Sequence, residues 1–256
     1  MRLPFTDEKN TRRRNNRNGF ILLLLLALPG LQGAHAQQTL FNLPSLVATE
    51  RHRAFMQEQV NVTTREAAFN FSSSYGLGKG FEVGLNVFGV NMNYAKGTPV
   101  LLTNRGEDRN APYSPLLLVT ALKVFEVNEY VRVGVGTQVG GNPFEGARLD
   151  FADFSYLSTV TRIPGTHLDL HGGAYYGSRG DIGRRNEVGW MAGYEWELDR
   201  HWHLMGDWIY GKNAVAVLVP GVVYLPHRKV ALSLGYQLPS PGSGNPRAVV
   251  FELTLL

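Results

Sequence analysis

Residues 187–211 read EVGWMAGYEWELDRHWHLMGDWIYG and contain all four tryptophans of the chain. Apolar and aromatic residues recur at every second position on both sides of a break near residue 199. The positions between them hold mostly glycine, histidine and carboxylate residues. A period of two is the signature of β-strands with one apolar face and one polar face. The stretch therefore predicts an antiparallel hairpin with a tight turn.

The register of this hairpin follows from its pattern, because a slip of one residue would move every side chain to the opposite face. The apolar set stays on one face only if the turn consists of residues 199–201. Trp196 then pairs with Leu204, and Trp190 pairs with Tyr210. Two aromatic clusters separated by a shorter apolar band are typical of the interfacial girdles of a membrane barrel. The predicted girdle residues are Trp190, Trp196, Trp202, Trp208 and Tyr210. The alternative is a hairpin that packs its apolar face on a soluble protein core.

The N-terminal residues have the pattern of a secretory signal peptide. Four arginines fall within residues 12–17, residues 20–28 (FILLLLLAL) are apolar, and residues 34–36 (AHA) form a small-residue cleavage site. We therefore predict a signal peptide at 1–36, cleaved before Gln37.

Removal of this leader changes the charge balance. The whole chain has 25 basic and 21 acidic residues; six and two of these fall in residues 1–36, so the mature chain has 19 of each. The sequence pI of 9.3 therefore reflects the leader and gives no argument for a nucleic-acid partner. The chain has no cysteine, which excludes disulfides and zinc–thiolate sites. We expect no cofactor and no bound metal.

Twelve strands are predicted in the mature chain. They cover residues 52–62, 65–76, 80–94, 114–126, 131–141, 147–162, 166–178, 187–198, 202–210, 213–225, 228–238 and 247–256. The first strand has the weakest pattern, because Glu58 interrupts its apolar face, and the choice between ten and twelve strands stays open. Residues 37–50 have no clear period and form either a periplasmic tail or a segment inside the lumen. Residues 51–256 form the predicted barrel domain.

The connections between these strands differ at the two ends. Long polar loops at 95–113, 141–146, 179–186 and 239–246 fall at one end, and tight turns fall at the other. Long outer loops, short periplasmic turns and an even number of strands are typical of bacterial outer-membrane barrels. The predicted fold is all-β: a closed, antiparallel, up-and-down transmembrane β-barrel of about 12 strands in the cell outer membrane.

A second hairpin is predicted around a two-residue turn at residues 128–129. Its alternation pairs Glu126 with Val131 and places Lys123 on the same face as Arg132. The apolar set expected to face lipid in its first strand is Leu116, Leu118, Leu122 and Val124.

The polar faces of the strands predict a wet lumen with charges of both signs. The predicted lumen-lining residues are Lys123, Arg132, Asp169, His171, Glu195, Glu197, His203 and Asp207. Mixed charge favours a pore with little ion selectivity. A barrel of about twelve strands lies between the packed eight-stranded barrels and the open pores of 16–18 strands, so the lumen should be narrow.

The last strand, residues 248–256 (AVVFELTLL), resembles the C-terminal assembly signal of Gram-negative outer-membrane barrels, although it lacks the usual final aromatic residue. In length, strand pattern and turn spacing, residues 50–256 resemble outer-membrane transporters of the phenol meta-degradation type. This resemblance implies a channel for small, hydrophobic molecules. It also implies that outer-membrane lipids and the barrel assembly machinery are partners.

A passive channel or transporter for small molecules is the favoured function, and the chain is not expected to be an enzyme. One alternative is a lipid-modifying hydrolase at the rim, because His167, Asp169 and His171 share a strand face, as do His203 and Asp207. No G-x-S-x-G motif supports that alternative. A structural or adhesion barrel that acts through its loops is the other alternative.

Overall fold

The structure is a computed structural model that describes residues 40–255 except 45, 96, 109 and 145–150. The predicted signal peptide lies outside these residues. The strands are β1 (Ala54–Val62), β2 (Glu66–Gly78), β3 (Phe81–Asn93), β4 (Val100–Leu102), β5 (Leu116–Glu126), β6 (Val131–Gly141), β7 (Ala152–Arg162), β8 (Leu168–Gly177), β9 (Val188–Glu197), β10 (Trp202–Ile209), β11 (Val217–His227), β12 (Val230–Pro239) and β13 (Ala248–Leu255). The helix α2 (Arg179–Ile182) has a single turn. No helix in the described part of the chain is long and apolar enough to cross a membrane.

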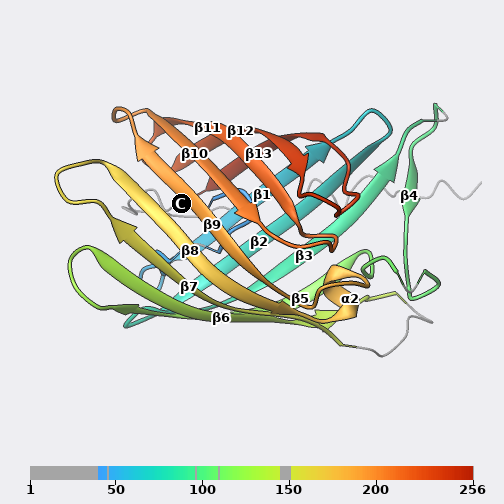
Figure 1. Cartoon of the computed structure of the whole chain (residues 1–256), viewed down its shortest axis with the longest axis horizontal. Coiled ribbons are helices and arrows are strands. Elements are labelled where there is room, and N and C mark those ends of the chain that lie inside the picture. The colour runs from blue at the N-terminus through green and yellow to red at the C-terminus, as the bar shows by residue number, and fades with distance from the viewer. Residues whose placement is uncertain (1–39, 45, 96, 109, 145–150, 256) are drawn as a thin grey trace, which may run out of the picture. The chain divides into compact units, whose positions relative to one another are not determined.

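Twelve of the strands form one closed antiparallel ring (Figure 1). Each strand pairs with its neighbours in the sequence, and β1 closes the ring by pairing with both β2 and β13. The predicted barrel is therefore confirmed, and its weakest predicted strand belongs to it as β1. The short strand β4 stands outside the ring and pairs antiparallel with the last three residues of β3.

The two ends of the barrel differ as the sequence indicates. Tight turns join β2 to β3, β5 to β6, β7 to β8, β9 to β10 and β11 to β12, and we call this the turn end. The other end, which we call the loop end, has the long connection that contains β4 and the connection that contains α2. The loop end also has two shorter links, at residues 63–65 and 210–216.

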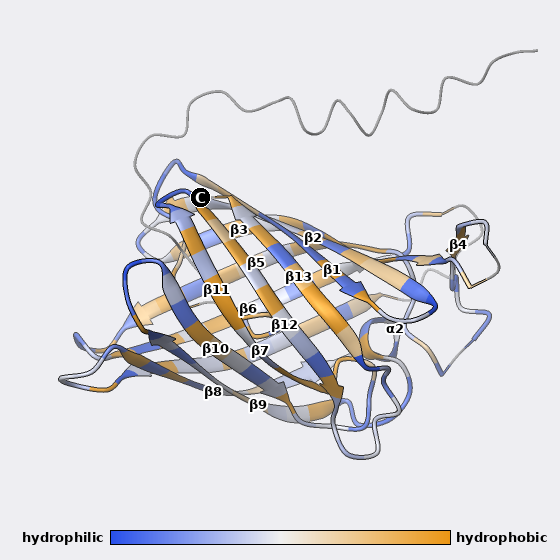
Figure 2. Cartoon of the chain, turned by 90° about the horizontal axis from the view of Figure 1, so that it is seen from above, coloured by the Kyte–Doolittle hydropathy of each residue, from blue (hydrophilic) through white to orange (hydrophobic). Residues whose placement is uncertain are grey.

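The outer face of the tryptophan hairpin has the predicted register. Leu204 pairs with Trp196, and the Tyr210 backbone N–H donates to the Trp190 carbonyl at 3.0 Å. The ring of Trp190 stacks on Tyr210 at 5.0 Å between centroids and meets the edge of Trp208 at 4.6 Å. Large apolar side chains also cover the outside of the other strands, several of which alternate in hydropathy along their length (Figure 2).

The predicted register of the second hairpin is wrong. Glu126 pairs with Arg132 rather than Val131, and the Val127 N–H donates to the Val131 carbonyl at 2.9 Å, so the turn has three residues. This shift places Lys123 opposite Val135 on the outer face, where its ammonium donates to the Lys79 carbonyl near the turn end. The residues Leu116, Leu118, Leu122 and Val124, predicted to face lipid, are buried inside the barrel.

The physical reason for this error is that β5 is apolar on both faces. Its outward set also consists of apolar residues, apart from Lys123: Leu117, Val119, Ala121 and Phe125. Alternation therefore cannot identify the lipid face. The inward side chains fit because they lie opposite glycines of β6: Leu118 opposite Gly140, Leu122 opposite Gly136, and Val124 opposite Gly134.

Candidate channel lumen

The lumen contains described residues that precede β1, from Leu40 onward. The side chains of Leu40, Phe41, Leu43 and Leu46 are 1–5% exposed. The first three pack in one core with inward side chains of β7 to β13, including Met205 and Val219. Leu46 packs in a second core with Leu122, Val124 and Val160. We call the described residues of 40–50 the lumenal segment. Residues 37–50 were expected to form either a periplasmic tail or a segment inside the lumen, and the described residues lie inside the lumen.

Glycines in the barrel wall provide the space for this segment. A Cβ atom on Gly193 would lie 2.6 Å from Leu40 Cδ1, and one on Gly235 would lie 2.7 Å from Phe41 Cζ. Real Cβ atoms essentially never approach that closely, so any larger residue at these positions would require the Leu40 or Phe41 side chain to shift. The wall is therefore shaped to receive these side chains.

Asp207 holds the backbone of the lumenal segment. Its carboxylate accepts hydrogen bonds from the N–H groups of Asn42 and Leu43, the second at 3.0 Å, and from the Asn42 side-chain amide at 3.3 Å. Asp207 is only 1% exposed. A buried carboxylate is stable only when donors replace its water, and here the segment supplies them.

Other contacts fix the segment near the turn end. The Thr49 N–H donates to Glu82 Oε2 at 2.6 Å, and its hydroxyl lies 2.6 Å from that of Ser74. The Arg132 guanidinium donates to the Leu46 carbonyl at 3.3 Å. In addition to Asp207 of β10, two parts of the wall therefore hold the segment: β2–β3 and β6.

Charged side chains gather at the turn end of β6 to β10. Arg162 binds Asp169 through two hydrogen bonds of 2.7 and 2.9 Å and approaches Glu197 at 3.4 Å. Arg132 lies 3.8 Å from the same Asp169 carboxylate. On the neighbouring strands, His203 Nδ1 lies 2.8 Å from Glu195 Oε1. Because these groups largely neutralise one another, the cluster presents little net charge to the lumen.

The predicted lumen-lining residues thus fall into three groups. The strand pairings put Arg132, Asp169, His171, Glu195, Glu197 and His203 on the inner face near the turn end. Asp207 is also inward but lies beneath the lumenal segment, and Lys123 points outward. A direct role for any of them in permeation stays a prediction. Arg162 completes the cluster and was not among the predicted residues, because the pattern of β7 did not identify its inner face.

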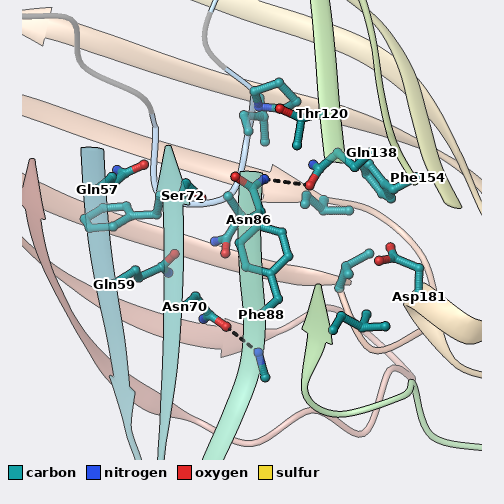
Figure 3. Close-up of a pocket in the computed structure, with 18 of the residues that line it drawn as sticks. Gln57, Gln59, Asn70, Ser72, Asn86, Phe88, Thr120, Gln138, Phe154 and Asp181 are labelled. Carbon is teal, nitrogen blue, oxygen red and sulfur yellow. Dashed lines mark hydrogen bonds between the residues drawn. The ribbon is translucent and has the colours of Figure 1, made fainter. Parts of the chain in front are cut away.

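A cavity of about 380 Å³ runs between the lumenal segment and the wall formed by β1 to β6 (Figure 3). Amide side chains line much of it: Gln57, Gln59, Asn61, Asn70, Asn86 and Gln138. Asn86 Nδ2 donates to Gln138 Oε1 at 2.8 Å, and Asn70 Oδ1 accepts the Gly89 N–H at 2.9 Å. Of the described residues that line this cavity, none is Lys, Arg or His.

Asp181 of α2 brings a carboxyl to the loop end of the cavity, outside the strands. Burial raises the pKa of the Asp181 carboxyl to about 7, and the negative charge of Asp153 adds to this rise. The group therefore titrates close to neutral pH. The sequence gives no indication of this, because residue 181 falls in a loop that reads only as charged.

The histidines that suggested a rim hydrolase do not converge on one site. His203 is paired with Glu195, and His167 lies 3.6 Å from Glu197. His171 points inward, and its Nε2 is buried with no hydrogen-bond partner in the described structure. Over the same residues, no group of three or more His, Asp or Glu side chains is placed to hold a metal ion.

Comparisons with known proteins agree with this architecture. The KdgM porin has a TM-score of 0.55 at 9% identity, and the match covers 79% of this chain and 98% of that chain. A structure of KdgM porin in complex with disordered oligogalacturonate has a TM-score of 0.52 at 10% identity, and the NanC porin has 0.50 at 10%, both with the same coverage. The sequence itself matches no known family and no curated protein. At these identities the likeness concerns the fold, and the chain has a porin-like barrel.

Proposed function

We propose that the mature chain is a passive channel of the outer membrane for small polar molecules. The observation that carries this proposal is a closed barrel with an apolar exterior and a cavity along the inside of its wall whose lining includes many amide and hydroxyl side chains. Strands can cross a bilayer only when every backbone group pairs with a neighbour, and the ring of twelve strands meets this condition.

The two aromatic clusters of the β9–β10 hairpin support a membrane position. At the loop end, Trp190 and Tyr210 are 41% and 43% exposed. At the turn end, Trp196 and Trp202 are 48% and 45% exposed. Such large aromatic surfaces are favourable where bilayer and water meet. We propose that these residues, with Trp208, form the girdle and that outer-membrane lipids surround the chain.

The narrower resemblance to transporters of the phenol meta-degradation type remains a proposal, as does assembly by the outer-membrane barrel machinery. The amide and hydroxyl groups of the cavity favour a polar solute over the hydrophobic one that this resemblance implies. One similar structure, the KdgM porin, is described with oligogalacturonate, an acidic oligosaccharide. The cavity here has no cationic lining residue among the described ones, which argues against an acidic solute.

Single-channel recording tests the proposed function. The purified mature chain, inserted in a planar bilayer in KCl, should produce discrete conductance steps. Separation of cell membranes should place it in the outer-membrane fraction, with heat-modifiable migration on a semi-native gel. A chain that folds without detergent and stays in the periplasm would refute the proposal.

A further inference from the structure

We infer that the cavity between the lumenal segment and β1 to β6 selects neutral, hydroxyl-rich solutes of sugar size. This inference rests on the proposed channel function and adds the class of solute. Three features of the cavity carry it: its amide lining, its aromatic rings, and the separation of cationic side chains from it.

The amide lining matches the chemistry of a hydroxyl group. A hydroxyl both donates and accepts, and so does each Asn or Gln side chain. The amide lining residues come from the lumenal segment and from five of the strands, β1, β2, β3, β6 and β12, and Ser72, Ser74 and Thr120 add hydroxyl groups between them. A solute with several hydroxyls can exchange its water for these groups without loss of hydrogen bonds.

Bonds within the wall orient several of these amides. The 2.8 Å bond between Asn86 and Gln138 uses one end of each side chain, and the Gly89 N–H occupies the oxygen of Asn70. On β1, Gln59 Nε2 donates to Asn61 Oδ1 at 3.1 Å. Both ends of the Asn61 amide are occupied, because its Nδ2 donates to Gln237 Oε1 at 3.3 Å. The remaining ends of Asn70, Asn86 and Gln138 are held in defined directions, which reduces the entropy lost when a solute binds.

Aromatic rings add a second kind of surface. Phe55, Phe88, Tyr113, Phe154 and Tyr156 line the same cavity as the amides. Figure 3 shows Phe88 beside Asn86 and Asn70, and Phe154 near Gln138. Flat rings next to hydrogen-bonding groups suit a solute with apolar C–H faces and polar edges, which is the character of a sugar ring.

The cationic side chains of the inner wall are held elsewhere. Arg132 is tied to the Leu46 carbonyl and to Asp169, and Arg162 is tied to Asp169 and Glu197. The carboxylates that do line the cavity are Glu82, bound to the Thr49 N–H, and Asp181. An anionic sugar would therefore meet carboxyl groups without a cation to balance its charge, which is unfavourable.

The test uses two solutes that share a ring and differ in charge: D-glucose and D-glucuronate. Proteoliposomes of the full mature chain should admit glucose at least threefold faster than glucuronate at pH 8. In the double variant Asn86→Leu with Gln138→Leu, glucose entry should fall at least threefold relative to KCl conductance. The single variant Gln138→Leu should show a smaller decrease in glucose entry. It tests the same inference if the double variant does not fold.

A neighbouring residue on the same strand provides the matched control. Thr137 follows Gly136 on β6 and points outward, where its hydroxyl lies 2.9 Å from that of Ser155. Thr137→Val should leave both entry rates unchanged. Equal or faster entry of glucuronate than glucose, with KCl conductance intact, would overturn the inference and leave the channel function standing. Absence of both conductance and solute entry would overturn the channel function and the inference together.

Discussion

Asp207→Ala should release the lumenal segment and widen the pore. The carboxylate accepts the backbone N–H groups of Asn42 and Leu43, and without it these buried donors lose their acceptor in the docked state, at a cost of about 1–3 kcal/mol each. The variant also removes the cost of burying the carboxylate, so the expected net loss is about 2–4 kcal/mol. Since 1.4 kcal/mol corresponds to a factor of ten, undocked segments should become roughly 30- to 1,000-fold more frequent.

Two measurements report this change. The chain has no cysteine, so Asn42→Cys gives a single thiol within the segment. Its reaction with a membrane-impermeant maleimide should accelerate by the same factor when Asp207→Ala is added. In planar bilayers, the double variant should spend more time in a larger conductance level than the Asn42→Cys protein.

The control removes a carboxylate that does not touch the segment. Asp153 lies on the outer face of β7, where it accepts hydrogen bonds from Thr137 and Ser155. Asp153→Ala should leave the labelling rate unchanged. Equal labelling of the Asp207→Ala and Asp207 proteins, with both folded by heat-modifiable migration, would refute the view that Asp207 retains the segment.

Three further outcomes are expected. A Cβ on Gly134 would lie 3.4 Å from Leu46 Cγ, so the double variant Leu46→Cys with Gly134→Cys should form a disulfide on oxidation and keep the pore at its low conductance. The control variant, Leu46→Cys with the outward Thr137→Cys, should form no disulfide. A gel shift would report the bond. Glu58 pairs with Phe71 and Leu253 on the outer face, where a charged residue is unfavourable next to lipid, so Glu58→Leu should stabilise the barrel by about 1–2 kcal/mol in urea unfolding. The control variant Gln59→Leu changes an inward residue and should not stabilise the barrel. Because the pKa of Asp181 is raised to about 7, its side chain is neutral below that pH and anionic above it, and the ratio of K⁺ to Cl⁻ permeability should rise between pH 6 and 8. This rise should be absent in Asp181→Asn, and its persistence there would assign the titration to another group.

The parts of the barrel that could be predicted from the sequence are those with one polar and one apolar face. In the hairpin of β9 and β10, parity alone gives the correct pairing of Trp196 with Leu204. In β5 both faces are apolar, so the same argument gave the wrong face for Leu118 and Leu122 and placed Lys123 inside. Alternation reports a difference between two faces, and it gives no information where that difference is absent.

The candidate lumen was harder to predict for a different reason. Leu40, Phe41, Leu43 and Leu46 have no period, so no strand or helix pattern marks them. The signal that could have identified them is their apolar character, since side chains of this kind directly after a leader need a place to be buried. From the sequence alone, the glycines that contact these side chains are interpreted as residues that ease strand curvature. Nothing in the sequence indicates that Gly193 lies against Leu40. The predicted lumen-lining residues were all charged residues or histidines, so the Asn and Gln side chains of the cavity were not among them.

The contact between Asp207 and the lumenal segment has a consequence for how such a barrel can open. In the docked state the carboxylate has exchanged water for the N–H groups of Asn42 and Leu43. If the segment leaves, water can enter the lumen and solvate both the carboxylate and those N–H groups, so the polar cost of opening is small. The apolar cost is the exposure of Leu40, Phe41 and Leu43, which are 2–5% exposed when docked. Burial of these three side chains, more than the hydrogen bonds, therefore sets how often the segment leaves.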